Sequence, residues 1–361
     1  MSYTAISLFS GLGGDSLGLK QAGVNVIAYN ELKSKFCESH QANFPECELI
    51  TEGAITDISK LSNDCFLKYK GRTDVIFAGF PCQGFSNAGK KQDNDPRNTL
   101  FREFLRATAL IEPSMFIGEN VKGLLSKRTE PDDILYIDVI VAEFEKLGYD
   151  VKYQVCKTDQ FNVPQKRERL IIIGTKKDNK FGWTPKFPKP NKNNPNITNI
   201  IKYSMEGSVK VNPDLFVGIP DDCILTDIAD KKKYDDNNNA HPYLLSKLNA
   251  DVAMRTWKNK IHPTLFSFEK RDSPIHCEIV NIKKPAKTIL CSYDHQPRFF
   301  VPLKNSSGCY LRMLLPDELK QIQGFPPQHI VLGTTKEKIT QIGNAVPPPL
   351  IKAIVETIIR D

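Results

Sequence analysis

The sequence predicts an α/β protein with a doubly wound, mostly parallel sheet and a smaller domain inserted towards its C-terminal end. Three features of the 361 residues lead to this expectation. Short apolar runs alternate with helical patterns as far as about residue 175. The composition then changes abruptly, and the chain ends in a helical segment with one apolar face.

The alternating pattern predicts six strands, with helices between several of them. Strands that alternate with helices are typical of a parallel sheet, because parallel neighbours need long crossover connections. The predicted strands are residues 5–9, 24–29, 75–78, 115–118, 151–155 and 170–174. Helices are expected to begin near Asp15, Lys33, Thr99 and Asp133, the last one ending at Leu147 before Gly148.

A domain boundary is expected near Trp183, where the sequence becomes rich in Pro, Asn and Lys and loses its apolar periodicity. The following residues, 186–305, are expected to form loops and short strands. The apolar face of the final helix has to pack on something, and the sheet of the first half is the natural partner. Residues 1–185 and 330–361 are therefore predicted to form one domain, with residues 186–329 inserted into it.

Composition limits the kind of protein without deciding its function. The 49 Lys and Arg exceed the 42 Asp and Glu, and the net charge of +7 suits nucleic acid as a partner and equally an ordinary basic surface. Nine scattered cysteines without a C-x-x-C pair favour reduced thiols and no bound metal. No stretch resembles a leader or a membrane span. We expect a cytoplasmic monomer that is not attached to a membrane.

A glycine-containing loop separates the first predicted strand from the first helix. Such a loop lets the backbone approach a ligand closely, although a tight structural turn has the same composition. Glu31 follows the second strand, where a carboxylate can accept hydrogen bonds from ribose hydroxyls, unless it is an ordinary surface residue. Together with Asp57 the loop suits an adenosine-bearing ligand. Its residues are Phe9, Ser10, Gly11, Leu12 and Gly13.

Cys82 follows the strand at 75–78, on a loop stiffened by Pro81. Open sheets carry their active sites at this edge, but a free cysteine is more often an inert core residue. The next strand delivers Glu119 to the same edge, and Arg167 and Arg169 stand two residues apart, so both can face one way in an extended chain. A thiol, a carboxyl and arginine donors make a usable site, with an edge salt bridge as the alternative.

With these residues in this order, the sequence resembles the cytosine-5 DNA methyltransferases. Six segments match motifs of that family and follow one another in the family's order. The segments are Phe9 to Gly13, Pro81 to Gln83, Glu119 to Val121, Gln165 to Arg169, Arg312 with Gln323 to Pro326, and Gln341 to Pro348. The resemblance implies a catalytic domain of the S-adenosylmethionine-dependent methyltransferase fold, and it makes the insertion a target-recognition domain.

The resemblance also implies roles for individual residues. The Cys82 thiolate would add to carbon six of a cytosine flipped out of double-stranded DNA, with Glu119 at the ring nitrogen and Arg167 and Arg169 near the base carbonyl and Glu119. S-adenosylmethionine would be held by Phe9, Ser10, Gly11, Leu12, Gly13, Glu31, Asp57, Ile58, Pro81, Asn344 and Ala345. DNA contacts are expected from Ser86, Lys90, Lys91, Arg97, Thr288 and Arg298.

Two alternatives stay open within this family resemblance. One branch of the family methylates transfer RNA, although a long insertion favours a domain that reads DNA sequence. A catalytically silent DNA-binding relative is the other, and the intact thiol, carboxyl and arginines weigh against it. A stand-alone enzyme from a bacterial restriction-modification system is the working hypothesis.

Overall fold

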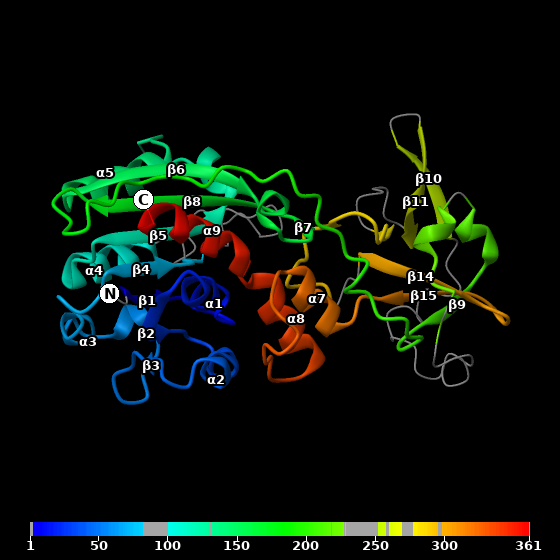
Figure 1. Cartoon of the computed structure of the whole chain (residues 1–361), viewed down its shortest axis with the longest axis horizontal. Coiled ribbons are helices and arrows are strands. Elements are labelled where there is room, and N and C mark those ends of the chain that lie inside the picture. Colours follow the sequence, from blue (N-terminus) through cyan, green and yellow to red (C-terminus); the bar gives the residue numbers. More distant parts are fainter. Residues whose placement is uncertain are drawn as a thin grey trace.

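The computed structural model describes residues 3–81, 100–129, 132–217, 219–226, 228, 252–257, 260–268, 277–294 and 298–360. Two large sheets organise these residues. Figure 1 shows the seven-stranded sheet at the left and the six-stranded one at the right, with α7 (Pro316–Ile322) and α8 (Thr335–Asn344) between them.

The larger sheet confirms the predicted α/β class. Its strand order is β3-β2-β1-β4-β5-β8-β6, and all neighbours are parallel except those of β8, which runs antiparallel to β5 and β6. Each of the six predicted strands is present, and β5 runs three residues further than expected. The strands are β1 (Tyr3–Leu8), β2 (Val24–Asn30), β3 (Glu48–Leu49), β4 (Val75–Ala78), β5 (Met115–Val121), β6 (Tyr149–Lys157) and β8 (Glu168–Lys176).

Helices cover both faces of this sheet, as a doubly wound fold requires. On one face, Phe104 of α4 and Phe144 of α5 pack on Phe116 of β5. On the other, α1 lies so close to α9 that a Cβ on Gly18 would stand 2.6 Å from the Pro348 carbonyl oxygen. The helices are α1 (Gly14–Gln21), α2 (Ser34–Asn43), α3 (Asp64–Leu67), α4 (Phe101–Ile111), α5 (Tyr136–Lys146) and α9 (Pro348–Ile359).

The final helix packs where the sequence predicts. Leu350, Ile351, Ile354, Val355 and Ile358 of α9 are buried in one cluster with Ala5 of β1 and Ile117 of β5. The chain therefore returns to the first sheet after forming the second. This return is what an inserted domain requires, while the limits 186–329 remain a prediction.

The smaller sheet has more regular structure than the expected loops and short strands. Its order is β10-β11-β12-β14-β15-β9. Antiparallel pairing joins β14 to β15, and their apolar side chains form a core with α7 and α8. The strands are β9 (Val209–Val211), β10 (Val252–Trp257), β11 (Lys260–Phe268), β12 (Cys277–Ile279), β14 (Phe299–Asn305) and β15 (Gly308–Met313).

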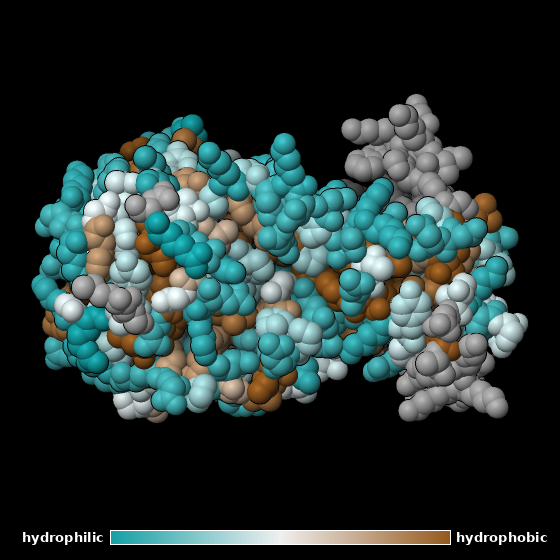
Figure 2. All heavy atoms as spheres, viewed as in Figure 1, coloured by the Kyte–Doolittle hydropathy of each residue, from teal (hydrophilic) through white to brown (hydrophobic). Residues whose placement is uncertain are grey.

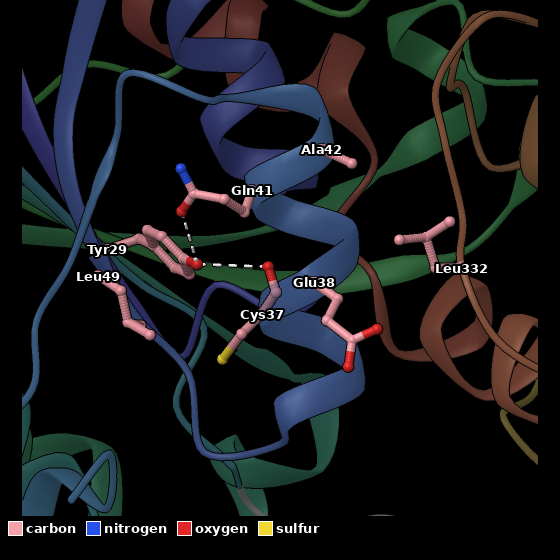
Figure 3. A pocket seen from close by; sticks show the side chains of 7 residues that line it. All are labelled: Tyr29, Cys37, Glu38, Gln41, Ala42, Leu49 and Leu332. Carbon is pink, nitrogen blue, oxygen red and sulfur yellow. Dashed lines mark hydrogen bonds between the residues drawn. The ribbon is translucent and has the colours of Figure 1, made fainter. Parts of the chain in front are cut away.

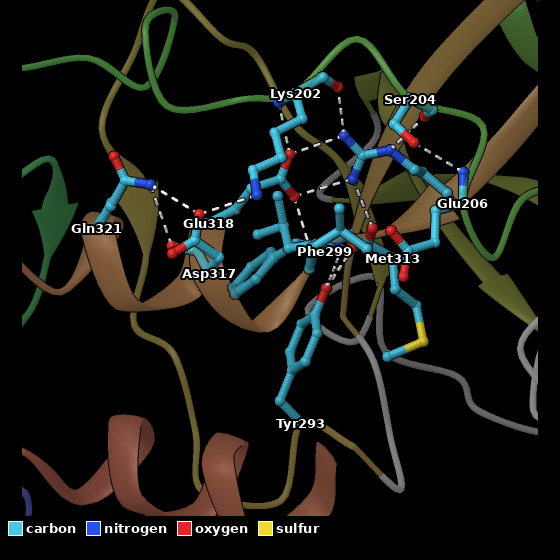
Figure 4. A network of polar contacts seen from close by, with 12 residues as sticks. Lys202, Ser204, Glu206, Tyr293, Phe299, Met313, Asp317, Glu318 and Gln321 are labelled. Carbon is cyan, nitrogen blue, oxygen red and sulfur yellow. Dashed lines mark hydrogen bonds and ion pairs between the residues drawn. The ribbon is translucent and has the colours of Figure 1, made fainter. Parts of the chain in front are cut away.

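A buried ion pair ties the chain entering the smaller sheet to the chain leaving it. Arg312 and Glu318 are both 0% exposed, and an Arg312 Nη2 to Glu318 Oε1 distance of 2.7 Å marks one of their two contacts. Figure 4 shows Lys202, Ser204 and Met313 gathered around this pair. Backbone groups of these three residues bond to the ion pair. It therefore fixes both crossings between the sheets, the segment that leads into the smaller sheet and the segment that leads out of it.

Charged and polar side chains cover most of the face shown in Figure 2. No helix in the described part of the chain is long and apolar enough to cross a membrane.

Two buried histidines lie beneath the loop after β1. His40 stacks on Tyr29 with ring centroids 3.8 Å apart, and its Nε2 is 2.9 Å from Ser16 Oγ. His329 Nε2 donates to the Leu12 carbonyl oxygen at 3.2 Å. Burial lowers the pKa of His40 to about 3 and that of His329 to about 4. Both are therefore neutral in the folded protein.

These histidines predict a loss of stability in mild acid. The unfolded chain takes up their protons below pH about 6.5, whereas the folded protein does not, so stability is present above that pH and is lost as the pH falls. Each histidine is expected to cost about 2 kcal/mol between pH 7 and 5. Asp15, whose pKa burial raises to about 7, acts in the opposite direction.

A comparison of the wild type with His329→Gln removes the contribution of Asp15 to the pH dependence, because both proteins contain Asp15. His329→Gln keeps a donor for the Leu12 carbonyl but cannot titrate. Urea unfolding at both pH values should therefore show a smaller acid loss for this variant than for the wild type. Equal losses in the two proteins would refute the assignment.

Candidate active site

The loop after β1 folds tightly against the segment that precedes α9. Gly13 has a φ of 80°, which suits glycine, and it caps α1. A Cβ on Gly14 would stand 2.0 Å from the Val346 carbonyl oxygen, so this position has no room for a side chain. The loop therefore touches the segment that contains Asn344 and Ala345, as their shared predicted role requires.

Glu31 anchors the same loop. Its Oε2 accepts from the Gly11 backbone N–H at 2.9 Å and its Oε1 from that of Lys33 at 2.9 Å. Burial is the main influence on this carboxyl and raises its pKa, while the backbone donors oppose the rise. A carboxylate has about four acceptor positions, so these backbone donors leave capacity for a ligand hydroxyl.

Asn30 brings Asp57 to this edge of the sheet. Its Nδ2 donates to the Ile50 and Thr56 carbonyl oxygens at 3.1 and 3.0 Å, which fixes the segment before Asp57 beside the end of β2. Asp57 Oδ1 accepts from Ser59, a contact that lowers the pKa of the carboxyl. Sequence reasoning missed Asn30, whose signal was a polar residue at the end of a buried strand.

The loop fits a ligand with hydrogen-bonding groups. Ser10 is 5% exposed, and no group among the described residues bonds to its Oγ. An unsatisfied buried hydroxyl is costly, so a ligand partner is a natural explanation. Ile58 is buried and Pro81 partly exposed at the same sheet edge. These features suit the adenosine-bearing cofactor that the sequence suggested.

Glu119 and Arg169 meet at the C-terminal edge of the sheet. Arg169 Nε lies 2.6 Å from Glu119 Oε1, and their side chains are 13% and 12% exposed. A Cβ on Gly79 would stand 3.8 Å from Glu119 Oε2, so the carboxyl lies beside the segment that follows β4. Asn120 Nδ2 donates to the Phe80 carbonyl oxygen at 3.1 Å and holds that segment in place.

The carboxyl thus lies beside the chain that leads into Cys82. Cys82 itself lies outside the described residues, as do Ser86, Lys90, Lys91 and Arg97. The proposed nucleophile and the predicted DNA loop therefore stay predictions.

Arg167 is close enough to Glu119 and Arg169 to feel both charges, but its hydrogen bonds go elsewhere. Its Nη1 donates to the Ile289 carbonyl oxygen at 3.1 Å and its Nη2 to that of Gly343 at 3.0 Å. The reason is a break in the extended chain, since β7 (Gln165–Lys166) ends before Arg167 and β8 begins after it. Of the two arginines, Arg169 is the one that pairs with Glu119.

The two predicted recognition residues lie apart. Thr288 follows β13 (Ala286–Lys287), which pairs with β7, and its Oγ1 donates to the Lys166 carbonyl oxygen at 2.8 Å. The carbonyl oxygen of Arg298 accepts from the Glu278 N–H at 2.7 Å. Thr288 is therefore next to β7, whereas Arg298 directly precedes β14 of the smaller sheet.

A shallow hollow lies beside α2 (Figure 3). Figure 3 shows Tyr29 bonding to the Cys37 carbonyl and to Gln41, with Leu332 on the other side of α2. None of the predicted site residues lines it. We therefore place the functional site at the sheet edge and not here.

The chain is similar to known proteins along nearly its whole length. The model of the C-5 cytosine-specific DNA methylase family matches residues 3–360. The chain belongs to this family. It is 32% identical to the type II methyltransferase M1.HphI of Haemophilus parahaemolyticus, across 100% of the chain and 87% of that protein. It is also 30% identical to M.Eco47II of Escherichia coli, across 99% of the chain and 79% of that protein.

A solved structure supports the fold. An Escherichia coli protein, described as a DNA modification methyltransferase encoded within a prophage, aligns with a TM-score of 0.67. It is 21% identical, with 100% of both chains covered. The predicted methyltransferase fold and the resemblance to cytosine-5 DNA methyltransferases are therefore confirmed, and the chain is a DNA cytosine-5 methyltransferase.

Proposed function

We propose that this methylase transfers a methyl group from S-adenosylmethionine to carbon five of a specific cytosine in double-stranded DNA, through a covalent adduct with Cys82. The observation that carries the proposal is the Glu119–Arg169 pair beside the chain that leads into Cys82. We further propose that it serves a restriction-modification system, as the type II relatives suggest.

The chemistry follows from the weak nucleophilicity of carbon five in cytosine. The Cys82 thiolate bonds to carbon six, and the electron pair displaced from the ring double bond makes carbon five nucleophilic. Glu119, held by Arg169, donates a hydrogen bond or proton to the ring nitrogen and stabilises the ring as charge develops there. Once carbon five carries the methyl group, loss of its proton restores the double bond and expels the thiolate.

The cofactor supplies an electrophilic methyl group for carbon five. Glu31 is suited to its ribose hydroxyls and Asp57 to its adenine amino group. The loop from Phe9 to Gly13 would enclose it together with Ile58, Pro81, Asn344 and Ala345.

Stacked cytosine does not present carbon six to a side chain, so the base has to leave the duplex. The Thr288 hydroxyl, which donates to the Lys166 carbonyl oxygen of β7 without DNA, is suited to a phosphate near the flipped base once it turns towards the DNA. Arg298, beside β14 of the smaller sheet, is suited to guanine in the major groove.

Expression in a methylation-free bacterial host followed by bisulfite sequencing tests the proposal. Modified cytosines are expected in one short sequence context. A blank map despite folded protein would count against DNA as the substrate. Total RNA from the same cells separates the alternative, since methylated transfer RNA with unmodified DNA would favour the RNA branch of the family.

Replacing Glu119 by Gln is expected to lower kcat by about 10²- to 10³-fold, because an amide cannot donate a proton to the ring nitrogen. Affinity for S-adenosylhomocysteine should change by less than about threefold, since the cofactor contacts lie on other elements. Single-turnover methylation and isothermal titration measure the two quantities. A normal rate in this variant would remove Glu119 from the mechanism.

A further inference from the structure

Arg167 joins two segments that are far apart in the sequence. Its side chain is 3% exposed, and its two terminal nitrogens bond to the carbonyl oxygens of Ile289 and Gly343, which lie 122 and 176 residues away. Ile289 follows the predicted DNA contact Thr288. Gly343 precedes the predicted cofactor contacts Asn344 and Ala345.

Gln165 also connects the segment at Ile289 with the segment at residues 343–345. Its Oε1 accepts from the Ile289 N–H at 3.2 Å, and its Nε2 donates to Gln323 Oε1. Gln323 in turn donates to the Ala345 carbonyl oxygen. Both backbone polar groups of Ile289 are thus held by side chains from one short stretch, and both glutamines are 0% exposed.

The two segments also touch directly. A Cβ on Gly343 would stand 2.5 Å from the Cys291 backbone nitrogen, so the end of α8 packs against backbone with no space between. Thr340 Oγ1, which donates to the Lys336 carbonyl oxygen at 2.8 Å, also lies 3.5 Å from the Cys291 carbonyl oxygen. A shift of residues 288–291 therefore has to move residues 343–345 or break these contacts.

The charge of Arg167 is not used to neutralise a neighbour in contact with it. Within the described residues it forms no ion pair, and burial followed by the nearby charge of Arg169 lowers its pKa. What the arrangement uses is the planar fork of donors, which reaches two carbonyl groups at once. Holding a buried guanidinium in this way is costly, which argues against a role in packing alone.

We propose that Arg167 is a positioning residue that couples cofactor binding to DNA binding. It does so by fixing residues 288–289 and 343–345 against the strand that carries Arg169. This inference rests on the proposed function, because it takes Thr288 as a DNA contact and Asn344 and Ala345 as cofactor contacts. Coupling of this kind is reciprocal, so each ligand raises the affinity for the other by the same factor.

The test measures the Kd of S-adenosylhomocysteine with and without a duplex that contains the methylated sequence. In the wild type the duplex is expected to tighten this Kd by at least about fivefold. In Arg167→Gln the ratio should fall to within about twofold of one, while kcat at saturation falls by less than about tenfold. Arg167→Lys keeps the charge but offers one ammonium nitrogen in place of the fork that reaches two carbonyls, so it should give an intermediate ratio.

Arg169→Lys is the matched control, two residues along the same chain. It should lower kcat by about 10²-fold or more and leave the coupling ratio unchanged, because Arg169 contacts Glu119 and neither of the two segments. Near-ultraviolet circular dichroism of each variant checks folding. If Arg167→Gln fails to fold, the ratio in Arg167→Lys decides, and it should lie at least about twofold below that of the wild type.

Three results would overturn the inference. The first is a wild-type Kd for S-adenosylhomocysteine that the duplex does not change. The second is a coupling ratio in the Arg167 variants equal to that of the wild type. The third is a loss of kcat in the Arg167 variants as large as in Arg169→Lys, while both ligands still bind to them with wild-type affinity. Failure of the proposed function itself would look different, because the wild type would then not methylate duplex DNA at all.

Discussion

Cys82→Ser is expected to lower methyl transfer to DNA by at least about 10⁴-fold while the protein keeps its affinity for S-adenosylhomocysteine. A serine hydroxyl is barely ionised at neutral pH, and the mechanism begins with a thiolate adding to carbon six. The described residues explain why this position is suitable. Asn120 fixes the Phe80 carbonyl, and Glu119 lies next to Gly79, so the chain enters residue 82 beside the acid.

A mechanism-based duplex sharpens this test. If the target cytosine carries fluorine at carbon five, there is no proton to remove there after methyl transfer, so the bond to the sulfur of Cys82 cannot break. The wild type should remain attached to such DNA in denaturing gels, and Cys82→Ser should not.

Cys65→Ser is the control for loss of a thiol as such. Cys65 lies in α3, and the polar contacts of its sulfur among the described residues are with Thr51, Glu52 and Ser62, none of which is a predicted site residue. This variant should methylate and form the adduct at wild-type rates. Substantial methylation by Cys82→Ser would remove the thiolate from the mechanism, whereas equal loss in both variants would point to general damage.

The larger sheet could be predicted from the sequence because its signals are local. Apolar runs such as Val75–Ala78 lie in strands, and the apolar stripe of residues 350–358 marks a helix that packs on the sheet. Helix starts were less accurate, and the one expected near Asp133 begins at Tyr136. Two-residue strands such as β7 and β13 carry no periodic signal, since only their pairing partner makes them strands.

In the site, too, residues placed by a strand could be predicted, whereas contacts between distant segments could not. Glu119 and Arg169 could be anticipated, because neighbouring strands bring their ends to one edge of the sheet. The partners of Arg167 could not, because they are backbone carbonyls of residues 289 and 343, and backbone groups leave no mark in the sequence. Asn30 was missed for a related reason, since its task is to hold the carbonyls of Ile50 and Thr56.

Glu318→Gln is expected to destabilise the folded protein by about 3–5 kcal/mol. The substitution leaves the guanidinium of Arg312 fully buried without a counter-charge. A surface pair provides the contrast. Lys146 and Glu143 lie 2.6 Å apart with side chains 69% and 36% exposed, and Lys146→Gln should cost at most about 0.5 kcal/mol. Urea unfolding of the three proteins measures the difference.

The double variant Arg312→Met with Glu318→Leu tests whether the ion pair stabilises the protein through its hydrogen bonds to the backbone. A buried ion pair can often be replaced by apolar residues without loss of stability, because desolvation offsets the attraction between the charges. Here the pair also bonds to the backbone. Arg312 donates to three carbonyl oxygens, and Glu318 accepts from two backbone N–H groups. These groups would be left buried without partners, at about 1–3 kcal/mol each before water reaches them.

The double variant is therefore expected to stay at least about 2 kcal/mol less stable than the wild type. The crossings at Lys202–Ser204 and Met313–Leu315, which lead into and out of the smaller sheet, should loosen first and exchange their amide hydrogens faster. A double variant as stable as the wild type would mean that the hydrogen bonds from the pair to the backbone do not add to stability. In that case the crossings would be held by the apolar core between the sheets alone.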